Sequence, residues 1–240
     1  MTIPDWQSRT ELLLGKEALM KLRNSHVMVI GLGGVGAYAA EMLGRAGIGK
    51  LTIADGDKVQ RSNINRQLIA MESTLGDEKA EVMANRLREI NPEIELTVIN
   101  NFLRDKLMFD VLETPCDYVV DAIDTLSPKV FLIAKTLAKG YPIVSSMGSG
   151  GKLDPSLIKV CDISESYNCR LAYSLRKQLH KLGIREGFKV VFSPESVSKD
   201  SVKIVEAEQN KKSTVGTISY MPPIFGCFMA SVVIRDLLLK

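Results

Sequence analysis

Short apolar runs alternate with amphipathic segments along most of this chain. The apolar runs predict strands, and the segments between them predict helices, since their apolar residues recur at helical spacing. The strands are expected at 27–31, 51–55, 96–100, 117–121 and 142–146, and the helices at 34–46, 77–91, 103–112 and 127–139. Strands that alternate with helices are typical of a parallel sheet with right-handed crossovers. We therefore expect an α/β fold with a Rossmann-like, mostly parallel sheet and flanking helices.

The segments before and after this alternating region have different sequence patterns. Residues 1–25 carry Leu and Ala at helical spacing, and the part after Ser146 begins with a glycine-rich corner. There we expect a strand at 157–163, a basic helix at 167–182, a strand at 189–192, a mobile polar loop at 196–214 and a closing helix at 224–239. The predicted organisation is one continuous domain: an N-terminal helical segment (1–25), a nucleotide-binding core (26–150) and a C-terminal α+β region that binds substrate and completes the sheet (151–240).

A glycine-rich turn follows the first predicted strand and opens the first predicted helix. Its glycines are Gly31, Gly33, Gly34 and Gly36. Glycine at the first position permits a tight turn, the second lets a phosphate approach the backbone, and the last allows the helix to pack close to the strand. The helix N-terminus then offers unpaired N–H groups to an anion. Asp55 ends the second strand nineteen residues after Gly36, where a carboxylate can accept hydrogen bonds from a ribose. This arrangement predicts a site for a nucleotide with an adenosine end.

Cationic residues downstream of Asp55 distinguish between nucleotides. Asn65, Arg66 and Gln67 cluster in the linker to the next helix, and Lys79 lies where that helix begins. A guanidinium can bind phosphate oxygens in a bidentate manner, and an ammonium supplies a point charge. Lys79 on its own also fits a solvated helix face. Together these residues favour a triphosphate, since a nicotinamide site needs no extra cations.

Two carboxylates, Asp121 and Asp124, end the fourth predicted strand. Ligands of parallel α/β sheets bind at the carboxyl ends of the strands, so we expect both side chains to face the nucleotide crevice. A carboxylate there suits Mg²⁺ bound to phosphates. The predicted cofactors are therefore ATP and Mg²⁺.

The motifs G-x-G-G-x-G, D-x-D, S-N-x-N-R-Q and D-x-x-D, with Lys79, resemble the adenylating domain of the ubiquitin-activating-enzyme-like superfamily over roughly residues 9–150. Members of that superfamily activate a carboxylate with Mg-ATP and form an acyl-adenylate and pyrophosphate. The resemblance implies that Asp55 holds the ribose and that Asp57 supports the site. It also implies that residues later in the sequence hold the phosphates and the metal. The residues it assigns to ATP are the four glycines, Asp55, Asp57, Asn63, Asn65, Arg66, Gln67, Lys79, Asp121 and Asp124, with Asp124 on Mg²⁺ and Arg66, Lys79 and Asp124 taking part in catalysis.

Arg9 resembles the N-terminal arginine that reaches into the partner subunit's site in this superfamily. The resemblance therefore implies a catalytic role for Arg9 and a homodimer, because an arginine that acts in trans needs a second subunit.

The second half resembles the branch of the superfamily that dehydrates threonylcarbamoyladenosine in tRNA. The residues that carry this likeness lie at 142–155, 158–162 and 190–195. The branch implies adenylation of the threonyl carboxylate, intramolecular ring closure, and release of AMP and pyrophosphate. It implies a modified tRNA as partner, with a cysteine desulfurase-type sulfur-transfer protein as a candidate partner and a structural monovalent cation as a candidate cofactor.

Six basic residues stand against a single Glu186 between positions 170 and 189: Arg170, Arg176, Lys177, Lys181, Arg185 and Lys189. Such a concentration suits a phosphate backbone, and the alternative is a solvated helix face. Tyr167, Tyr173 and His180 are candidates for stacking on an unpaired base, or for packing.

Charge and cysteine content narrow the class of protein further. The net charge of +3 is too small on its own to indicate nucleic acid binding. No signal peptide or membrane-length apolar run is visible, so we expect a cytoplasmic protein with no membrane partner. The four cysteines, at 116, 161, 169 and 227, include no C-x-x-C pair, which argues against a four-cysteine zinc site and a disulfide framework. We expect reduced thiols without a covalent role, with Cys227 packed in the closing helix.

Two rival functions remain open at this stage. One is adenylation of the C-terminal glycine of a ubiquitin-like sulfur-carrier protein, although members of that type carry the zinc cysteines that this chain lacks. The other is an NAD-binding redox protein, in which Arg66, Lys79 and Asp124 would have no clear purpose.

Overall fold

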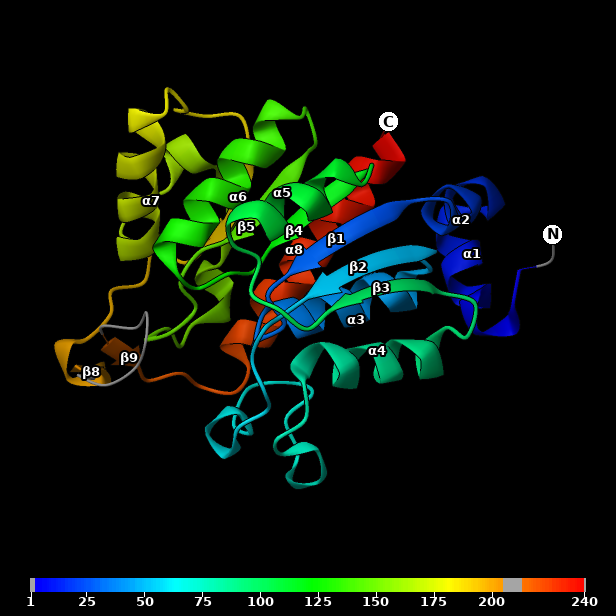
Figure 1. Cartoon of the computed structure of the whole chain (residues 1–240), viewed down its shortest axis with the longest axis horizontal. Coiled ribbons are helices and arrows are strands. Elements are labelled where there is room, and N and C mark those ends of the chain that lie inside the picture. Colours follow the sequence, from blue (N-terminus) through cyan, green and yellow to red (C-terminus); the bar gives the residue numbers. More distant parts are fainter. Residues whose placement is uncertain (1–2, 205–212, 240) are drawn as a thin grey trace.

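The computed structural model describes residues 3–204 and 213–239, and its centre is a seven-stranded sheet (Figure 1). The strands are β1 (His26–Ile30), β2 (Lys50–Ala54), β3 (Glu95–Ile99), β4 (Tyr118–Asp121), β5 (Ile143–Ser146), β6 (Lys159–Asp162) and β7 (Lys189–Phe192). Their order is β3-β2-β1-β4-β5-β7-β6. Neighbouring strands run parallel except β6, which is antiparallel to β7. The predicted α/β class with a mostly parallel sheet is confirmed.

The strand order reverses at β1, and this places the predicted nucleotide site. The chain moves outward from β1 to β2 and β3, then returns to lay β4 on the other side of β1. In register, Ile30 lies between Ala54 of β2 and Asp121 of β4. The residues after these three strand ends therefore meet at one edge, where open α/β sheets form their ligand crevice.

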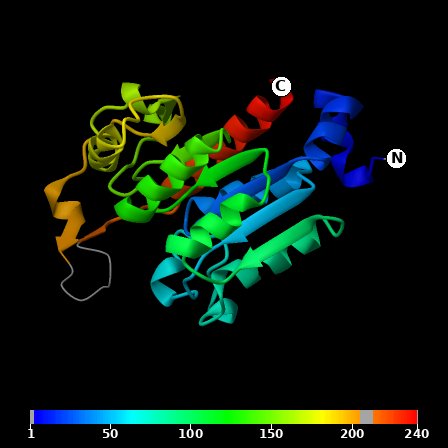
Figure 2. The ribbon, with the colours of Figure 1, turned by 45° about the horizontal axis from the view of Figure 1, so that its top comes forward.

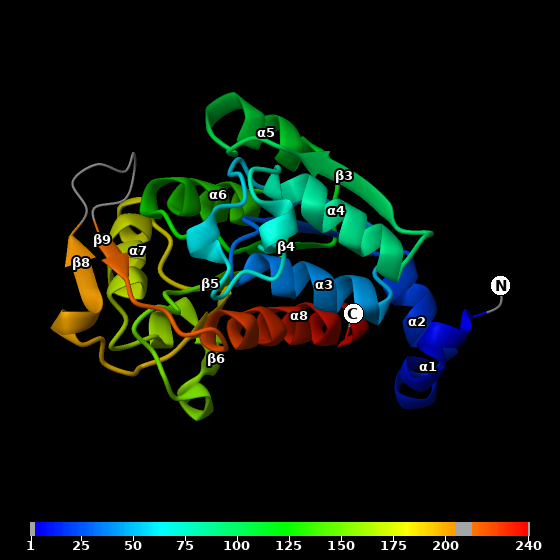
Figure 3. The ribbon, with the colours of Figure 1, turned by 90° about the horizontal axis from the view of Figure 1, so that it is seen from below.

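Helices cover both faces of the sheet. One face carries α2 (Lys16–Arg23), α3 (Gly36–Ala46), α4 (Lys79–Ile90) and α8 (Met221–Leu239), and the other carries α5 (Asp105–Glu113), α6 (Leu126–Ala138) and α7 (Arg170–Lys181). Figure 3 shows α8, α3 and α4 side by side. Within β1, Val27 and Val29 belong to one core while Met28 and Ile30 belong to the other. Burial on both faces explains why these strands are continuous apolar runs.

Helix α8 packs closely on α3. A Cβ on Gly226 would lie 2.4 Å from the Val35 carbonyl oxygen, so only glycine permits this approach. The helix begins three residues earlier than predicted, at Met221, because Pro222 and Pro223 occupy its first turn, where no intrahelical N–H donor is needed. By length and composition α8 could cross a membrane, but within the described fold it lies against α3 and the sheet as a core helix does.

The predicted loop at 196–214 contains regular structure. A short helix at Lys199–Ser201 is followed by β8 (Val202–Ile204), which pairs antiparallel with β9 (Ser213–Val215), and residues 205–212 lie outside the described part. Strands of three residues are too short to give a periodic signal. The β8–β9 pair and α7 lie at the end of the molecule opposite α1 (Ser8–Leu14) and α2 (Figure 2).

Gly226→Ala is expected to lower the free energy of unfolding by about 2 kcal/mol. The added Cβ meets backbone atoms of α3, and this overpacking outweighs the gain of about 1 kcal/mol in helix propensity. Urea unfolding followed by circular dichroism measures the loss. Ser231→Ala on the exposed side of the same helix is the control and should stay within about 0.5 kcal/mol of the wild type. Equal stability of the two variants would show that α8 has room to move away from α3.

Candidate active site

The glycine turn between β1 and α3 is compressed from several sides. Gly31 has a φ of +91°, and a Cβ there would lie 2.8 Å from the Ala122 carbonyl oxygen. A Cβ at Gly36 would lie 1.8 Å from the Gly31 carbonyl oxygen, and one at Gly34 would lie 2.9 Å from Cβ of Pro222. The turn therefore makes the tight bend and the close helix–strand approach predicted for Gly31 and Gly36, and it is wedged between the end of β4 and the start of α8.

Asp55 ties this turn to the end of β2. One carboxylate oxygen accepts the Leu32 N–H at 2.6 Å, and the other accepts the Asp57 N–H at 2.8 Å. Burial raises the pKa of Asp55 above its ordinary value, while the charge of Lys79 opposes that rise. The carboxylate thus supports the glycine turn from the side of β2.

Lys79 is buried and held by an ion pair. Its Nζ lies 3.0 Å from the Asp57 carboxylate, and its side chain is only 5% exposed whereas that of Asp57 is 51% exposed. The alternative of a solvated helix face is therefore wrong for Lys79. A buried ammonium held at the start of α4 is suited to a phosphate.

Arg66 and Asp124 lie close enough for their charges to interact. Burial lowers the pKa of the Arg66 guanidinium, and the charge of Asp124 opposes this effect. The guanidinium donates to the Ser62 carbonyl at 3.0 Å and to Asn65 Oδ1 at 2.8 Å. Asn65 in turn donates to the Thr217 carbonyl at 3.0 Å. These bonds orient Arg66 and connect its segment to the chain that leads into α8.

Asn63 and Gln67 are buried beneath the same segment. Asn63 Oδ1 accepts the Gln60 N–H at 3.1 Å and so stabilises the turn in which it lies. Gln67 Nε2 lies 3.8 Å from the position that a Cβ on Gly33 would take, so the amide lines the glycine turn. Within the described part of the chain, Gln67 Oε1 is buried without a hydrogen-bond partner.

The two carboxylates of D-x-x-D have different surroundings. Asp121 is fully buried, and its Oδ2 accepts hydrogen bonds from Lys129 Nζ at 2.7 Å and Ser145 Oγ at 2.6 Å. Its Oδ1 accepts the Ile123 N–H at 3.1 Å. The expectation that both side chains face the crevice is therefore wrong for Asp121, whereas Asp124 is exposed. Sequence reasoning missed Lys129, whose signal was a lysine among the apolar positions of α6.

The donor set fits a magnesium ion held mainly by phosphates. Among residues 3–204 and 213–239, no three His, Cys, Asp or Glu side chains gather where they could enclose a metal. Mg²⁺ at nucleotide sites needs only one or two carboxylates, because phosphates and waters supply its other ligands. The exposed carboxylate of Asp124 beside Arg66 meets that requirement.

Three of the four thiols, those of Cys116, Cys161 and Cys227, have raised pKa values, which is the opposite of what an activated nucleophile needs. Burial raises the pKa of Cys116 to about 12 and that of Cys161 to about 11, so both stay protonated near neutral pH. Cys227 is exposed, which corrects the expectation that it is packed inside the closing helix, and burial of its sulfur still raises its pKa.

Two of the six predicted tRNA-binding cations have partners within the fold. Arg176 donates to the Ser166 carbonyl at 2.7 Å, and Lys189 Nζ lies 2.6 Å from the Asp236 carboxylate. Both therefore have a structural contact, and tRNA binding by them stays a prediction. The other four are exposed, as Lys189 also is: Arg170, Lys177, Lys181 and Arg185.

The basic face of α7 consists of Arg170, Tyr173, Lys177 and Lys181, which share one side of the helix by their spacing of three, four and four residues. Tyr173 is 63% exposed, so packing does not account for it. Tyr167 is a packing residue, since its ring meets the Phe192 ring edge-on and its hydroxyl accepts from Lys159 at 2.8 Å.

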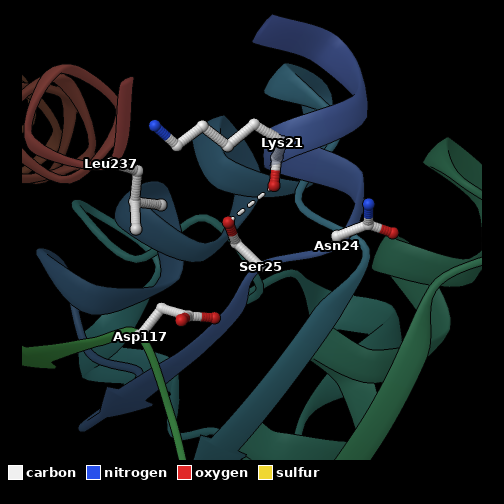
Figure 4. Close-up of a pocket in the computed structure, with 5 residues that line it drawn as sticks. All are labelled: Lys21, Asn24, Ser25, Asp117 and Leu237. Carbon is white, nitrogen blue, oxygen red and sulfur yellow. Dashed lines mark hydrogen bonds between the residues drawn. The ribbon is translucent and has the colours of Figure 1, made fainter. Parts of the chain in front are cut away.

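A cavity of about 310 Å³ lies at the opposite end of the strands, where β1 and β4 begin (Figure 4). Its lining residues are Lys21, Asn24, Ser25, Asp117 and Leu237, and none of them belongs to the predicted site. Arg9 is exposed on α1, and α1 packs on α2 at the end of the molecule where β1 begins (Figure 1). The structure therefore does not bring Arg9 together with the other site residues of its own chain.

Comparison with known proteins agrees with this geometry. The ThiF family model matches residues 7–240. The chain belongs to the ThiF family. A tRNA threonylcarbamoyladenosine dehydratase of Bacillus subtilis (strain 168) is 38% identical over 96% of this chain and 94% of that protein. A sulfur carrier protein ThiS adenylyltransferase of Escherichia coli (strain K12) is 36% identical, but over 55% of this chain and 53% of that protein.

Solved structures give the same likeness for this ThiF-family chain. The crystal structure of E. coli tRNA N6-threonylcarbamoyladenosine dehydratase in complex with ATP matches with a TM-score of 0.90 and 34% identity, covering 100% of this chain and 98% of that one. The AMP complex of the same E. coli protein gives a TM-score of 0.89 at 35% identity. At such identity and coverage the likeness extends through the C-terminal region.

Lys129→Met is expected to cost about 3–5 kcal/mol of stability, because it leaves the Asp121 carboxylate buried without its countercharge. The double variant Asp121→Asn/Lys129→Met should recover part of that loss, since no buried charge remains. Lys139→Met, at the residue that follows the same helix, removes a more exposed ion pair with Glu113 and should cost no more than about 1 kcal/mol. Urea unfolding of the three variants measures this order, and a Lys129→Met variant as stable as Lys139→Met would contradict it.

Proposed function

We propose that this ThiF-family chain is an ATP-dependent dehydratase that cyclises threonylcarbamoyladenosine in tRNA. The observation that carries the proposal is the extent of the likeness to the E. coli dehydratase, which covers nearly the whole of both chains and not only the nucleotide-binding half. The likeness to the sulfur-carrier adenylyltransferase stops at about half of each chain, so that alternative has less support.

In the proposed ATP site, the glycine turn and the N-terminus of α3 receive phosphate oxygens. Asp55 accepts ribose hydroxyls, while Arg66, Asn65 and Lys79 bind the phosphates from the other side. Gln67, with its buried and unpartnered Oε1, supplies a further polar group beside the turn. Asp124 would hold Mg²⁺, which when bound offsets negative charge on the phosphates.

The proposed chemistry needs few acid–base groups. The threonyl carboxylate attacks the α-phosphorus of ATP, pyrophosphate leaves, and the carboxylate becomes a mixed anhydride with AMP. A nucleophilic atom of the threonylcarbamoyl group then attacks the activated carbonyl, AMP leaves with the bond electrons, and the nucleophile loses its proton. Because nucleophile and carbonyl belong to one molecule, orientation supplies much of the rate. The raised pKa values of Cys116 and Cys161 agree with a route in which neither thiol forms an intermediate.

We propose the exposed basic face of α7 and the nearby Arg185 as the tRNA contact. Four cations with one nearby acid, Glu186, match the charge of a phosphate backbone, and Tyr173 lies among them with an exposed ring. Arg176 and Lys189 contribute indirectly, by fixing the segments at either end of α7.

Several further predictions have only the resemblance behind them. Arg9 is proposed to act in the site of a second subunit of a homodimer, which suits its place at the end of the molecule where β1 begins. A cysteine desulfurase-type partner and a structural monovalent cation also stay predictions, as does the cytoplasmic location, which was expected from the sequence itself.

The direct test is AMP release from ATP with purified protein and tRNA that carries threonylcarbamoyladenosine, followed by mass spectrometry of the digested nucleosides. We expect AMP with modified tRNA alone, together with loss of one water from the nucleoside. Asp124→Asn should lower AMP formation by roughly a hundredfold, because metal stabilisation of phosphate charge is worth several kcal/mol. Unmodified tRNA is the control. AMP formed with a sulfur-carrier protein ending in Gly-Gly, and with neither tRNA, would favour the rival function.

Lys177→Ala/Lys181→Ala is expected to weaken tRNA binding and to reduce the slope of log affinity against log salt by up to about 2, since each phosphate contact contributes about 1. Filter binding at several salt concentrations measures both quantities. The matched control is Lys16→Ala/Lys21→Ala, two exposed lysines on α2 at the other end of the molecule (Figure 1). An equal change in both double variants would assign the effect to net charge instead of to α7.

A further inference from the structure

Phe102 exposes 51% of its surface beside the proposed nucleotide crevice. A single exposed apolar side chain needs no explanation by itself, so its position must carry the argument. Phe102 follows β3, the neighbour of β2, and the Asp55 N–H donates to the Ile99 carbonyl at 3.1 Å. The segment after β3 therefore lies alongside the segment that follows the proposed ribose carboxylate.

The ring of Phe102 lies against the backbone of Gly56. A Cβ at Gly56 would lie 2.4 Å from the Phe102 nitrogen and 2.7 Å from two carbons of its ring. Any side chain at position 56 would therefore displace the ring. Because Gly56 directly follows Asp55, this contact places an aromatic ring close to the Asp55 carboxylate.

The guanidinium that now lies over the Phe102 ring can be displaced by a nucleobase. The guanidinium carbon of Arg104 lies over the ring, 5.0 Å from its centroid, and Arg104 is itself exposed. An exposed cation–π contact is weak compared with the stacking of a nucleobase on an aromatic ring. A base that arrives with its ribose held by Asp55 can therefore take the place of the guanidinium.

We infer that Phe102 is the stacking platform for the adenine ring of ATP. The inference rests on the proposed function, because it takes ATP as the nucleotide in the crevice. The same chemistry would fit the adenine of the modified tRNA nucleoside, so the test must separate the two sources. The position of the ring favours the adenine of ATP over that of the tRNA nucleoside. The ring contacts Gly56, the residue after the proposed ribose carboxylate Asp55, and it does not adjoin the basic face of α7 that is proposed to bind tRNA.

The experiment measures ATP binding by isothermal titration calorimetry in the absence of tRNA. Phe102→Ala should raise the Kd for ATP about tenfold, in line with the loss of one stacked base. Phe102→Trp should restore binding to within about threefold, because indole also stacks, whereas Arg104→Ala should change the Kd by no more than about twofold. The matched control is Phe109→Ala on α5, a ring that is 37% exposed and meets Phe131 edge-on.

Inorganic tripolyphosphate distinguishes stacking from support of the crevice. Its affinity should be the same for the wild type and Phe102→Ala, since it has no base. Equal loss of both ligands in Phe102→Ala would overturn the inference, because the ring would then support the phosphate site. Unchanged ATP binding together with impaired modification of tRNA would also overturn it and assign the ring to the substrate nucleoside. A wild-type chain that failed to bind ATP would instead refute the proposed function, and this inference with it.

Discussion

The steric constraint at the glycine turn determines the arrangement of everything around it. The Gly31 carbonyl oxygen lies less than 2 Å from the place that a Cβ on Gly36 would take, so α3 can begin there only because position 36 is glycine. The Asp55 carboxylate fixes the turn from the side of β2, and the backbone at Ala122 confines it from the side of β4. Three strand ends therefore share one rigid junction. A flexible junction would lose the preorganisation on which phosphate binding by backbone N–H groups depends.

The pair Asp121 and Asp124 shows how one short motif serves two purposes. Burial of the Asp121–Lys129 ion pair costs desolvation energy, and a well-packed apolar pair could be equally stable. Unlike an apolar pair, the ion pair also orients its neighbours, because the Asp121 carboxylate accepts hydrogen bonds from Ser145 Oγ and the Ile123 N–H. The turn after β4 is thus held in one conformation, and Asp124 projects from it into solvent beside Arg66.

Local pattern in the sequence was sufficient to predict the sheet and the glycine turn, since each of these depends on neighbours in the chain. Contacts between distant segments could not be predicted in this way. Lys189 pairs with Asp236, 47 residues away, and no local signal separates it from the solvated cations of α7. Likewise, which member of D-x-x-D is buried depends on Lys129 and Ser145 in other elements. The exposure of Cys227 follows from which side of α8 faces α3, and an almost uniformly apolar helix gives no periodicity from which to read that side.

Hydrogen bonds connect the C-terminal region to the segment of the proposed ATP site that carries Asn65 and Arg66. Lys152 is buried and donates to the Glu195 carbonyl, and the Leu153 and Asp154 N–H groups donate to the Glu195 carboxylate, so the glycine-rich corner after β5 is held firmly. The Tyr220 hydroxyl donates to the Leu153 carbonyl at 2.8 Å, just ahead of α8, and the Asn65 amide donates to the nearby Thr217 carbonyl. These hydrogen bonds join the segment of Asn65 and Arg66 to the C-terminal region by way of residues 217–220. The likeness to the E. coli dehydratase includes the C-terminal region, whereas the likeness to the sulfur-carrier adenylyltransferase covers only 55% of the chain, and we therefore propose that the C-terminal region selects the carboxylate.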